Sequence, residues 1–156
     1  MLKKFSKLVI GLFIIIIGIY FLWFYPRYSV PILTYHSFDY GKGLLSVAPE
    51  NFERQMHYLK DKHYNVISLE EFVNGMKAGR IFAHNTVVIT IDDGYENNYT
   101  CAYPVLKKYG FPAIIFLITN NIGNNTCYLN WNEINEMSRD NIFLAGIQKP
   151  TFICHR

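Results

Sequence analysis

Apolar and polar residues alternate along this chain with two different periods, which predicts a series of strands and helices. Short, continuously apolar runs predict buried strands at 30–36, 65–67, 87–91 and 112–119. Between them, apolar residues recur at helical spacing and predict helices at 49–64, 68–76, 98–109 and 131–139. This regular exchange of strand and helix is typical of an α/β fold with a parallel sheet or barrel.

Local signals mark the ends of several predicted helices. Pro49 suits a first helical turn, and Ser68 with Glu71 matches the capping-box pattern at the start of the next helix. Gly110 is placed to end the helix at 98–109, because glycine readily adopts the left-handed conformation of a C-terminal cap.

The number of strands limits the fold. Four predicted strands do not close a barrel, because a (β/α) barrel has eight strands and about 250 residues. The sequence therefore predicts either a small open sheet or the N-terminal half of a larger barrel. In a half barrel the strand at 112–119 would leave an unpaired apolar edge, which favours aggregation.

The N-terminal segment has a different pattern. Residues 1–7 form a basic leader, and residues 8–25 are apolar and carry no charge. A helix of this length spans about 27 Å, close to the hydrocarbon core of a bilayer. We predict a single-pass transmembrane anchor at 8–25, with lipid as its partner, a cytoplasmic leader and an extracytoplasmic domain. A cleaved signal peptide is the main alternative and a buried core helix is the third; the bulky aromatic end of the segment favours the anchor.

Charge and cysteine content exclude some functions. The net charge of +3 is small, and the lysines of the leader supply it. No basic run interleaved with aromatic residues follows residue 27, so the sequence does not predict nucleic-acid binding. The three cysteines include no C-x-x-C pair, which argues against a structural zinc site. Their spacing does not determine whether Cys101 and Cys127 form a disulfide.

Two adjacent carboxylates, Asp92 and Asp93, follow the predicted strand at 87–91 and precede Gly94. One carboxylate could hold a divalent cation, and the other could accept a proton from water. His36, at the end of the first predicted strand, could reach the same edge of the sheet. The alternative is structural: an Asp-Gly pair can simply form a turn and cap the following helix.

The acid pair belongs to a set of four separated motifs that occur in a fixed order. The motifs are PILTYH at 31–36, VAPENFERQM at 47–56, TIDDGY at 90–95 and FPAIIF at 111–116. Together they resemble the polysaccharide deacetylases with a NodB-homology domain, over about residues 29 to 140. The resemblance implies an irregular (β/α) barrel, of which 29–142 would be the N-terminal half.

The resemblance also implies an activity, which is the hydrolytic removal of acetyl groups from an N-acetyl sugar in a cell-envelope or extracellular polysaccharide. It assigns Asp92 as the general base and Asp93 as a ligand of a divalent metal, with zinc as the expected ion. Two histidines of a later H-[ST]-x-x-H motif would complete the metal site. Tyr35, His36 and Tyr95 are further candidates that could line the substrate site, although Tyr35 and Tyr95 could instead be packing residues.

The expected second motif does not occur between 141 and 156. If the codons there are read in a shifted frame, the genetic code permits Phe-Gly-Trp-His-Thr-Lys-Thr-His, which contains H-T-x-x-H. We therefore predict that 143–156 is an out-of-frame tail produced by a single-nucleotide change near codon 143. The rival interpretation is a genuine variant with a native tail.

Three functions follow from these patterns. The first is a metal-dependent carbohydrate deacetylase. The second is a catalytically inactive, truncated fragment of such an enzyme, with weak metal binding and at most a glycan- or partner-binding role. The third is an unrelated membrane-anchored α/β module in which Asp92 and Asp93 only cap a helix.

Overall fold

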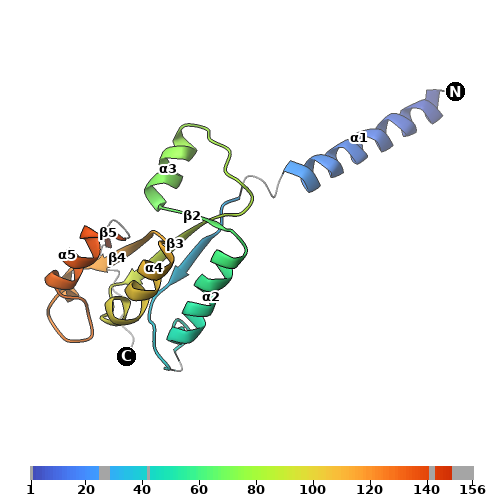
Figure 1. The fold of residues 1–156 in the computed structure, drawn as a ribbon. Coiled ribbons are helices and arrows are strands. Elements are labelled where there is room, and N and C mark those ends of the chain that lie inside the picture. Colours follow the sequence, from blue (N-terminus) through green and yellow to red (C-terminus); the bar gives the residue numbers. More distant parts are fainter. Residues whose placement is uncertain (1, 25–28, 42, 141–142, 149–156) are drawn as a thin grey trace, which may run out of the picture.

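Five parallel strands form one sheet at the centre of the fold (Figure 1). The computed structural model describes residues 2–24, 29–41, 43–140 and 143–148. The strands are β1 (Ile32–Tyr35), β2 (Asn65–Ile67), β3 (Thr86–Asp93), β4 (Ala113–Ile118) and β5 (Phe143–Gln148). They run in the order β1-β3-β4-β5, and β2 pairs with the first three residues of β3. The parallel sheet predicted from the apolar pattern is confirmed.

Helices connect the strands in the predicted order. They are α2 (Pro49–Asp61), α3 (Leu69–Lys77), α4 (Tyr103–Tyr109) and α5 (Trp131–Arg139). Two short helices complete the described elements. The π-helix η2 (Asn98–Ala102) leads directly into α4, and the 3₁₀-helix η3 (Thr119–Asn121) follows β4. The single helix predicted at 98–109 is therefore a π-helical turn that continues into α4.

The prediction of an unpaired edge after β4 is wrong. Six residues of β5 pair in parallel with six residues of β4, from Ala113 opposite Phe143 to Ile118 opposite Gln148. Residues 143–148 of the predicted tail thus form backbone hydrogen bonds as a regular strand, and 149–156 lie outside the described residues. A run of apolar and small residues suits a strand that continues a parallel sheet.

Strand β3 is the centre of the core. Its residues 86–91 are all buried, and successive side chains point to opposite faces. Val87, Ile89 and Ile91 join the cluster that includes buried residues of α2, α4 and α5. Val88 lies in the second cluster, with residues from β2 and the α3 region. The continuous apolarity of β3 is therefore explained by cover on both faces.

The helix caps follow the predicted signals with one difference. Gly110 ends α4 in the left-handed conformation with φ 66°, as predicted. The Ser68 hydroxyl accepts a hydrogen bond from the Glu71 backbone N–H at 3.1 Å, but the Glu71 carboxylate binds Arg80 instead of closing the box. The complete capping box is at the start of α5, between Asn130 and Glu133.

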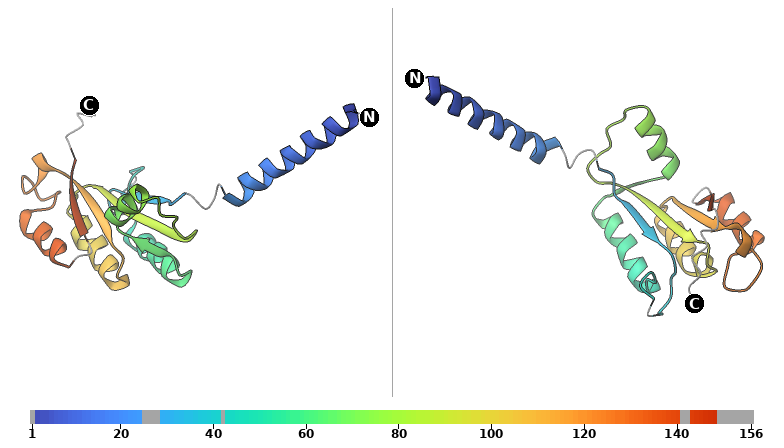
Figure 2. Two further views of the ribbon diagram at one scale, coloured as in Figure 1. Left: turned by 90° about the horizontal axis from the view of Figure 1, so that it is seen from above. Right: turned by 180° about the vertical axis from the view of Figure 1, so that it is seen from behind.

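Helix α1 (Leu2–Phe24) lies apart from the sheet in all three views (Figures 1 and 2). Within the ranges that the structure describes, no helix is both long enough and apolar enough to cross a membrane. The structure therefore does not support the transmembrane anchor predicted at 8–25.

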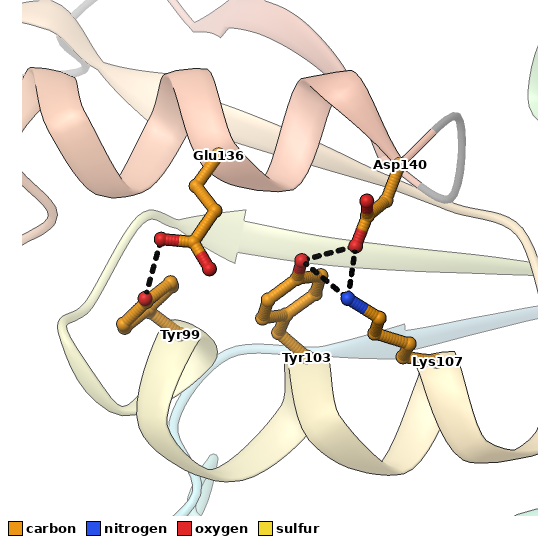
Figure 3. A network of polar contacts seen from close by, with 5 residues as sticks. All are labelled: Tyr99, Tyr103, Lys107, Glu136 and Asp140. Atoms are coloured by element: carbon orange, nitrogen blue, oxygen red, sulfur yellow. Dashed lines mark hydrogen bonds and ion pairs between the residues drawn. The ribbon is translucent and has the colours of Figure 1, made fainter.

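A network of polar side chains joins the helical segment η2–α4 to α5, the helix that comes before β5 in the chain (Figure 3). The Tyr99 hydroxyl donates to Glu136 at 2.8 Å. The Tyr103 hydroxyl donates to Asp140, and the Lys107 ammonium lies 2.6 Å from the same carboxylate. The Lys107 and Tyr103 contacts lower the pKa of Asp140. This network holds the end of α5 against η2 and α4.

Candidate active site

The parallel sheet brings the end of β1 next to the end of β3. Tyr35, the last residue of β1, is paired with Ile91, so the next residues along each strand, His36 and Asp92, are neighbours. The His36 Nε2 atom lies 3.6 Å from Asp92 Oδ2, and the two side chains are 23% and 24% exposed. This is an ion-pair distance whenever His36 is protonated. The sequence prediction that His36 reaches the acid pair thus agrees with the geometry.

Asp92 points away from the face of the sheet that α2, α4 and α5 cover. Because Ile89 and Ile91 face the cluster under α2, α4 and α5, the alternating residues Thr90 and Asp92 face the other side. On that side the Thr90 hydroxyl lies 3.0 Å from the hydroxyl of Thr34 on β1. Polar side chains therefore run along this face toward the end of the sheet, where Asp92 lies.

The surroundings of Asp92 raise its pKa. Burial is the largest cause, because it removes water from the carboxylate; the His36 charge opposes this effect, and the negative charge of Asp93 adds to it. A carboxylate with a raised pKa accepts a proton more readily than an ordinary aspartate. Such a group is suited to act as a general base.

This pKa shift predicts a pH dependence for the metal-free chain. The fold disfavours the ionised form of Asp92. Below the ordinary aspartate pKa of 3.8, Asp92 therefore does not lower the free energy of unfolding. As the pH rises through the raised pKa of the folded state, Asp92 lowers the free energy of unfolding. Asp92→Asn should therefore stabilise the chain at about pH 7 and change little at about pH 3, measured by urea denaturation. An equal effect at both pH values would contradict this explanation.

Asp93 and Gly94 form a tight turn at the end of β3. Both residues have positive φ, 70° and 73°, and the Gly94 N–H donates to the Asp92 carbonyl at 2.9 Å. Positive φ is uncommon for residues other than glycine and is strained. The turn is held from outside, because the Leu129 N–H donates to the Gly94 carbonyl at 3.0 Å. Because of this turn, the alternation of side chains between the two faces of β3 stops at Asp93.

We expect Gly94→Ala to destabilise the domain by about 2 kcal/mol, because alanine is strained in the left-handed region and its Cβ would meet Leu117. The distance from that Cβ to Leu117 Cδ2 would be 2.6 Å. Gly79→Ala is the matched control, since Gly79 has φ 68° and no atom within 4 Å of an added Cβ. Chemical denaturation of both variants measures the two costs. Equal costs would show that the Leu117 contact is unimportant.

The two predicted tyrosines are in different surroundings. Tyr95 follows the turn and stacks on Tyr128 at a ring-centroid distance of 5.1 Å. Burial, followed by the charge of Asp93, raises the Tyr95 pKa, so Tyr95 remains next to the acid pair. Tyr35 instead packs in the core, and its hydroxyl donates to Gln55 on α2 at 2.8 Å. Burial raises the Tyr35 pKa to about 12.

The sequence reasoning missed two asparagines that connect the β1 and β3 loops. The Asn97 amide accepts from the Phe38 N–H at 3.1 Å and donates to the Ser37 hydroxyl at 2.9 Å. Asn98 is completely buried, although Asn98-Tyr-Thr100 has the pattern of a glycosylation sequon. The signal that could have identified them is their position, directly after the acid-pair turn.

The donors near the acid pair are too few for a complete metal site. Across the described residues, no group of three or more His, Cys, Asp and Glu side chains is arranged to hold a metal ion. Catalytic zinc sites usually have three protein ligands. Asp92, Asp93 and His36 therefore do not by themselves fit the metal that the family resemblance implies. The acid pair also does not line the groove of about 910 Å³ between β1 and α2.

Comparison with known proteins finds relatives that cover most of this chain. A polysaccharide deacetylase family profile matches residues 79–146. YxkH of Bacillus subtilis, a candidate polysaccharide deacetylase, is 39% identical over 118 residues, which are 76% of this chain and 42% of that protein. The poly-β-1,6-N-acetyl-D-glucosamine N-deacetylase of Staphylococcus epidermidis is 36% identical over 102 residues, 65% of this chain and 35% of that protein. The chain thus spans less than half the length of these curated relatives.

A solved structure has a similar fold. The deacetylase PplD of Streptococcus pyogenes, determined in complex with acetate, superposes with a TM-score of 0.68 at 29% identity. The superposition covers 78% of this chain and 56% of that one. The parallel sheet and its order of helices therefore match those of a deacetylase.

Proposed function

We infer from the family to which this chain belongs, the polysaccharide deacetylases, that it supplies the general base for removing acetyl groups from an N-acetylated polysaccharide. The observation that carries this proposal is the placement of Asp92. Its carboxylate lies at the carboxyl end of a parallel strand, has a raised pKa and is 3.6 Å from His36. The carboxyl edge of a parallel sheet is where α/β enzymes bind their ligands.

The proposed step is hydrolysis of an amide. Asp92 accepts a proton from water while the water oxygen bonds to the acetyl carbon, and the carbon–nitrogen bond then breaks. The products are acetate and the amine of the sugar, which takes up a proton. His36 adjoins Asp92, and its protonated form would favour the ionised carboxylate. The Staphylococcus relative supports an N-acetylglucosamine polymer as the substrate class.

A divalent metal, with zinc as the first candidate, is part of this proposal, but the described residues do not complete its site. When bound, such a metal polarises a carbonyl or activates water. We propose Asp93 as one ligand, with the remaining ligands supplied by groups other than the His, Cys, Asp and Glu side chains of the described residues. Zinc should consequently bind the 156-residue chain weakly in calorimetry, and Asp93→Ala should remove that binding. Asp61→Ala, which changes an exposed aspartate on α2, is the control.

The test of function is acetate release. The purified chain is incubated with N-acetylglucosamine oligomers and excess zinc, and both acetate and new free amines are measured. Equal amounts of the two products, lost on adding a chelator, would support a metal-dependent N-deacetylase. Release of neither acetate nor new amines with excess zinc present would contradict amide hydrolysis by this chain.

The second candidate is an inactive chain that binds glycan or a partner. It is favoured by the lack of a three-donor group in the described part of the structure. This candidate predicts binding of N-acetylglucosamine oligomers without acetate release, even with excess zinc. Release of acetate that depends on Asp92 would rule it out.

The frame change and the location are separate proposals. We propose that the gene, read in the shifted frame after codon 142, encodes H-T-x-x-H and gives a frame-restored protein. The nucleotide sequence around codons 140–156 tests this directly, because a stop codon or a different amino-acid sequence in the shifted frame would contradict the proposal.

We also propose an extracytoplasmic site of action, which is tested by adding protease to intact spheroplasts. Protection of residues 29–142 would contradict it.

A further inference from the structure

Two adjacent asparagines bind three consecutive residues on the neighbouring loop. Asn97 contacts Phe38 and Ser37, as described above. In the amide orientation that suits its neighbours, Asn98 donates to the His36 carbonyl at 3.0 Å. The Asn98 oxygen then accepts from the backbone N–H of Tyr95 at 3.2 Å. Residues 36–38 are therefore fixed to the turn that follows Asp92 and Asp93.

Burial makes the Asn98 contacts necessary. Its side chain is completely buried, and a buried amide is costly unless its donors and acceptor are bonded. The π-helix η2 begins at Asn98, and its wide turn is closed by a hydrogen bond from the Tyr103 N–H to the Asn98 carbonyl. Isolated π-helical turns occur frequently at functional sites. Both the backbone and the side chain of Asn98 are thus constrained.

The sheet itself does not fix His36. The parallel pairing of β1 with β3 ends at Tyr35 and Ile91, one residue before His36 and Asp92. The Ser37 carbonyl accepts from the Val47 N–H at 2.9 Å, but this bond ties the β1 loop to itself rather than to β3. Within the described part of the chain, the hydrogen bonds that cross from 36–38 to the β3 side come from the two asparagines.

We propose that Asn97 and Asn98 are positioning residues that hold the His36 imidazole next to the Asp92 carboxylate. Asn98 fixes the backbone at His36, and Asn97 fixes the next two residues, so together they set the direction in which the His36 side chain leaves the chain. The importance of this for catalysis rests on the proposed function. The positioning itself does not, because it requires neither metal nor sugar.

The experiment measures the coupling between His36 and Asp92 by NMR on the full chain. At a pH high enough to ionise Asp92, its charge shifts the resonances of the His36 ring, and Asp92→Asn removes that charge. We expect a clear change in the His36 ring signals on Asp92→Asn in the native background. In the Asn98→Ala background the change should fall by about half or more, because a charge interaction weakens as the separation grows.

The controls separate positioning from stability. Asn85→Ala removes a similar loop-bridging amide, which donates to the His63 carbonyl at 2.7 Å away from the acid pair, and should leave the coupling unchanged. Asn97→Asp keeps an acceptor for the Phe38 N–H, so hydrogen exchange at Phe38 should stay slow, whereas Asn97→Ala should accelerate it. If Asn98→Ala does not fold, the coupling is measured in Asn97→Ala instead, because the Asn97 side chain is only partly buried.

The proposal would be overturned if the coupling between His36 and Asp92 stayed at its native size in a folded Asn98→Ala variant, or in Asn97→Ala where that variant replaces it. The two asparagines would then have a purely structural role. This outcome is distinct from failure of the proposed function. A chain that releases no acetate but shows the expected loss of coupling would contradict the function and uphold the positioning.

Discussion

Replacing Asp92 with asparagine is expected to lower the rate of acetate release by about 10²–10⁴-fold, the usual contribution of a general base. Asparagine has nearly the same shape as aspartate but cannot accept the proton of water. The rate should be measured with N-acetylglucosamine oligomers, in whichever of the 156-residue chain and the frame-restored protein is active. The loss should appear in kcat rather than in KM, because the proton transfer occurs only in the transition state.

Two matched variants make this result specific. Asp61→Asn changes an exposed carboxylate on α2, at 58% exposure, and should leave the rate unchanged. Asp93→Asn should lower the affinity for zinc, and added metal should restore part of its rate. A rate that excess zinc restores equally in Asp92→Asn and Asp93→Asn would contradict the separate roles that we propose for the two acids.

Replacing Phe52 with alanine should destabilise the domain by about 3–5 kcal/mol, the range for removing a fully buried phenylalanine. The Phe52 side chain is completely buried on α2. Its ring meets Tyr35 and Phe38 edge-on, at centroid distances of 5.0 and 4.6 Å. Because a small domain is stable by only about 5–15 kcal/mol, this single cavity removes a large share of the total.

Urea denaturation, followed by circular dichroism, measures this loss, and Tyr58→Ala is the control on the same helix. Tyr58 is 53% exposed, so its removal should change the free energy of unfolding by about 0.5 kcal/mol or less. Tyr35 and Phe38 flank His36 in sequence, so Phe52→Ala should also broaden the His36 signals. A loss of less than about 1 kcal/mol would mean that the rings repack around the cavity.

The order of strands and helices could be predicted from the sequence because it depends on local patterns. Apolar runs identified β1 to β4, and the position of Asp92 after such a run placed it at the carboxyl edge of the sheet. Parallel pairing then makes His36 its neighbour without further information. These predictions needed only periodicity and the geometry of parallel sheets.

The features that the sequence did not predict depend on contacts between distant segments. Asn97 and Asn98 bind residues about sixty positions earlier in the chain, and no local pattern encodes those partners. The sequence left open whether Tyr35 lines the site or packs, and in the structure its hydroxyl donates to Gln55 on α2. The pairing of β5 with β4 likewise depends on where α5 delivers the chain.

The left-handed conformation of Asp93 limits where this domain can gain or lose residues. In a regular strand, shifting the chain by one residue moves every following side chain to the other face. One residue inserted between Ile89 and Asp92 would turn Asp92 toward α2, α4 and α5. It would also shift Gly94, whose carbonyl accepts from the Leu129 N–H, by one position. We therefore expect insertions to be tolerated in the loop at 78–85, before β3, and to abolish function within the last four residues of the strand.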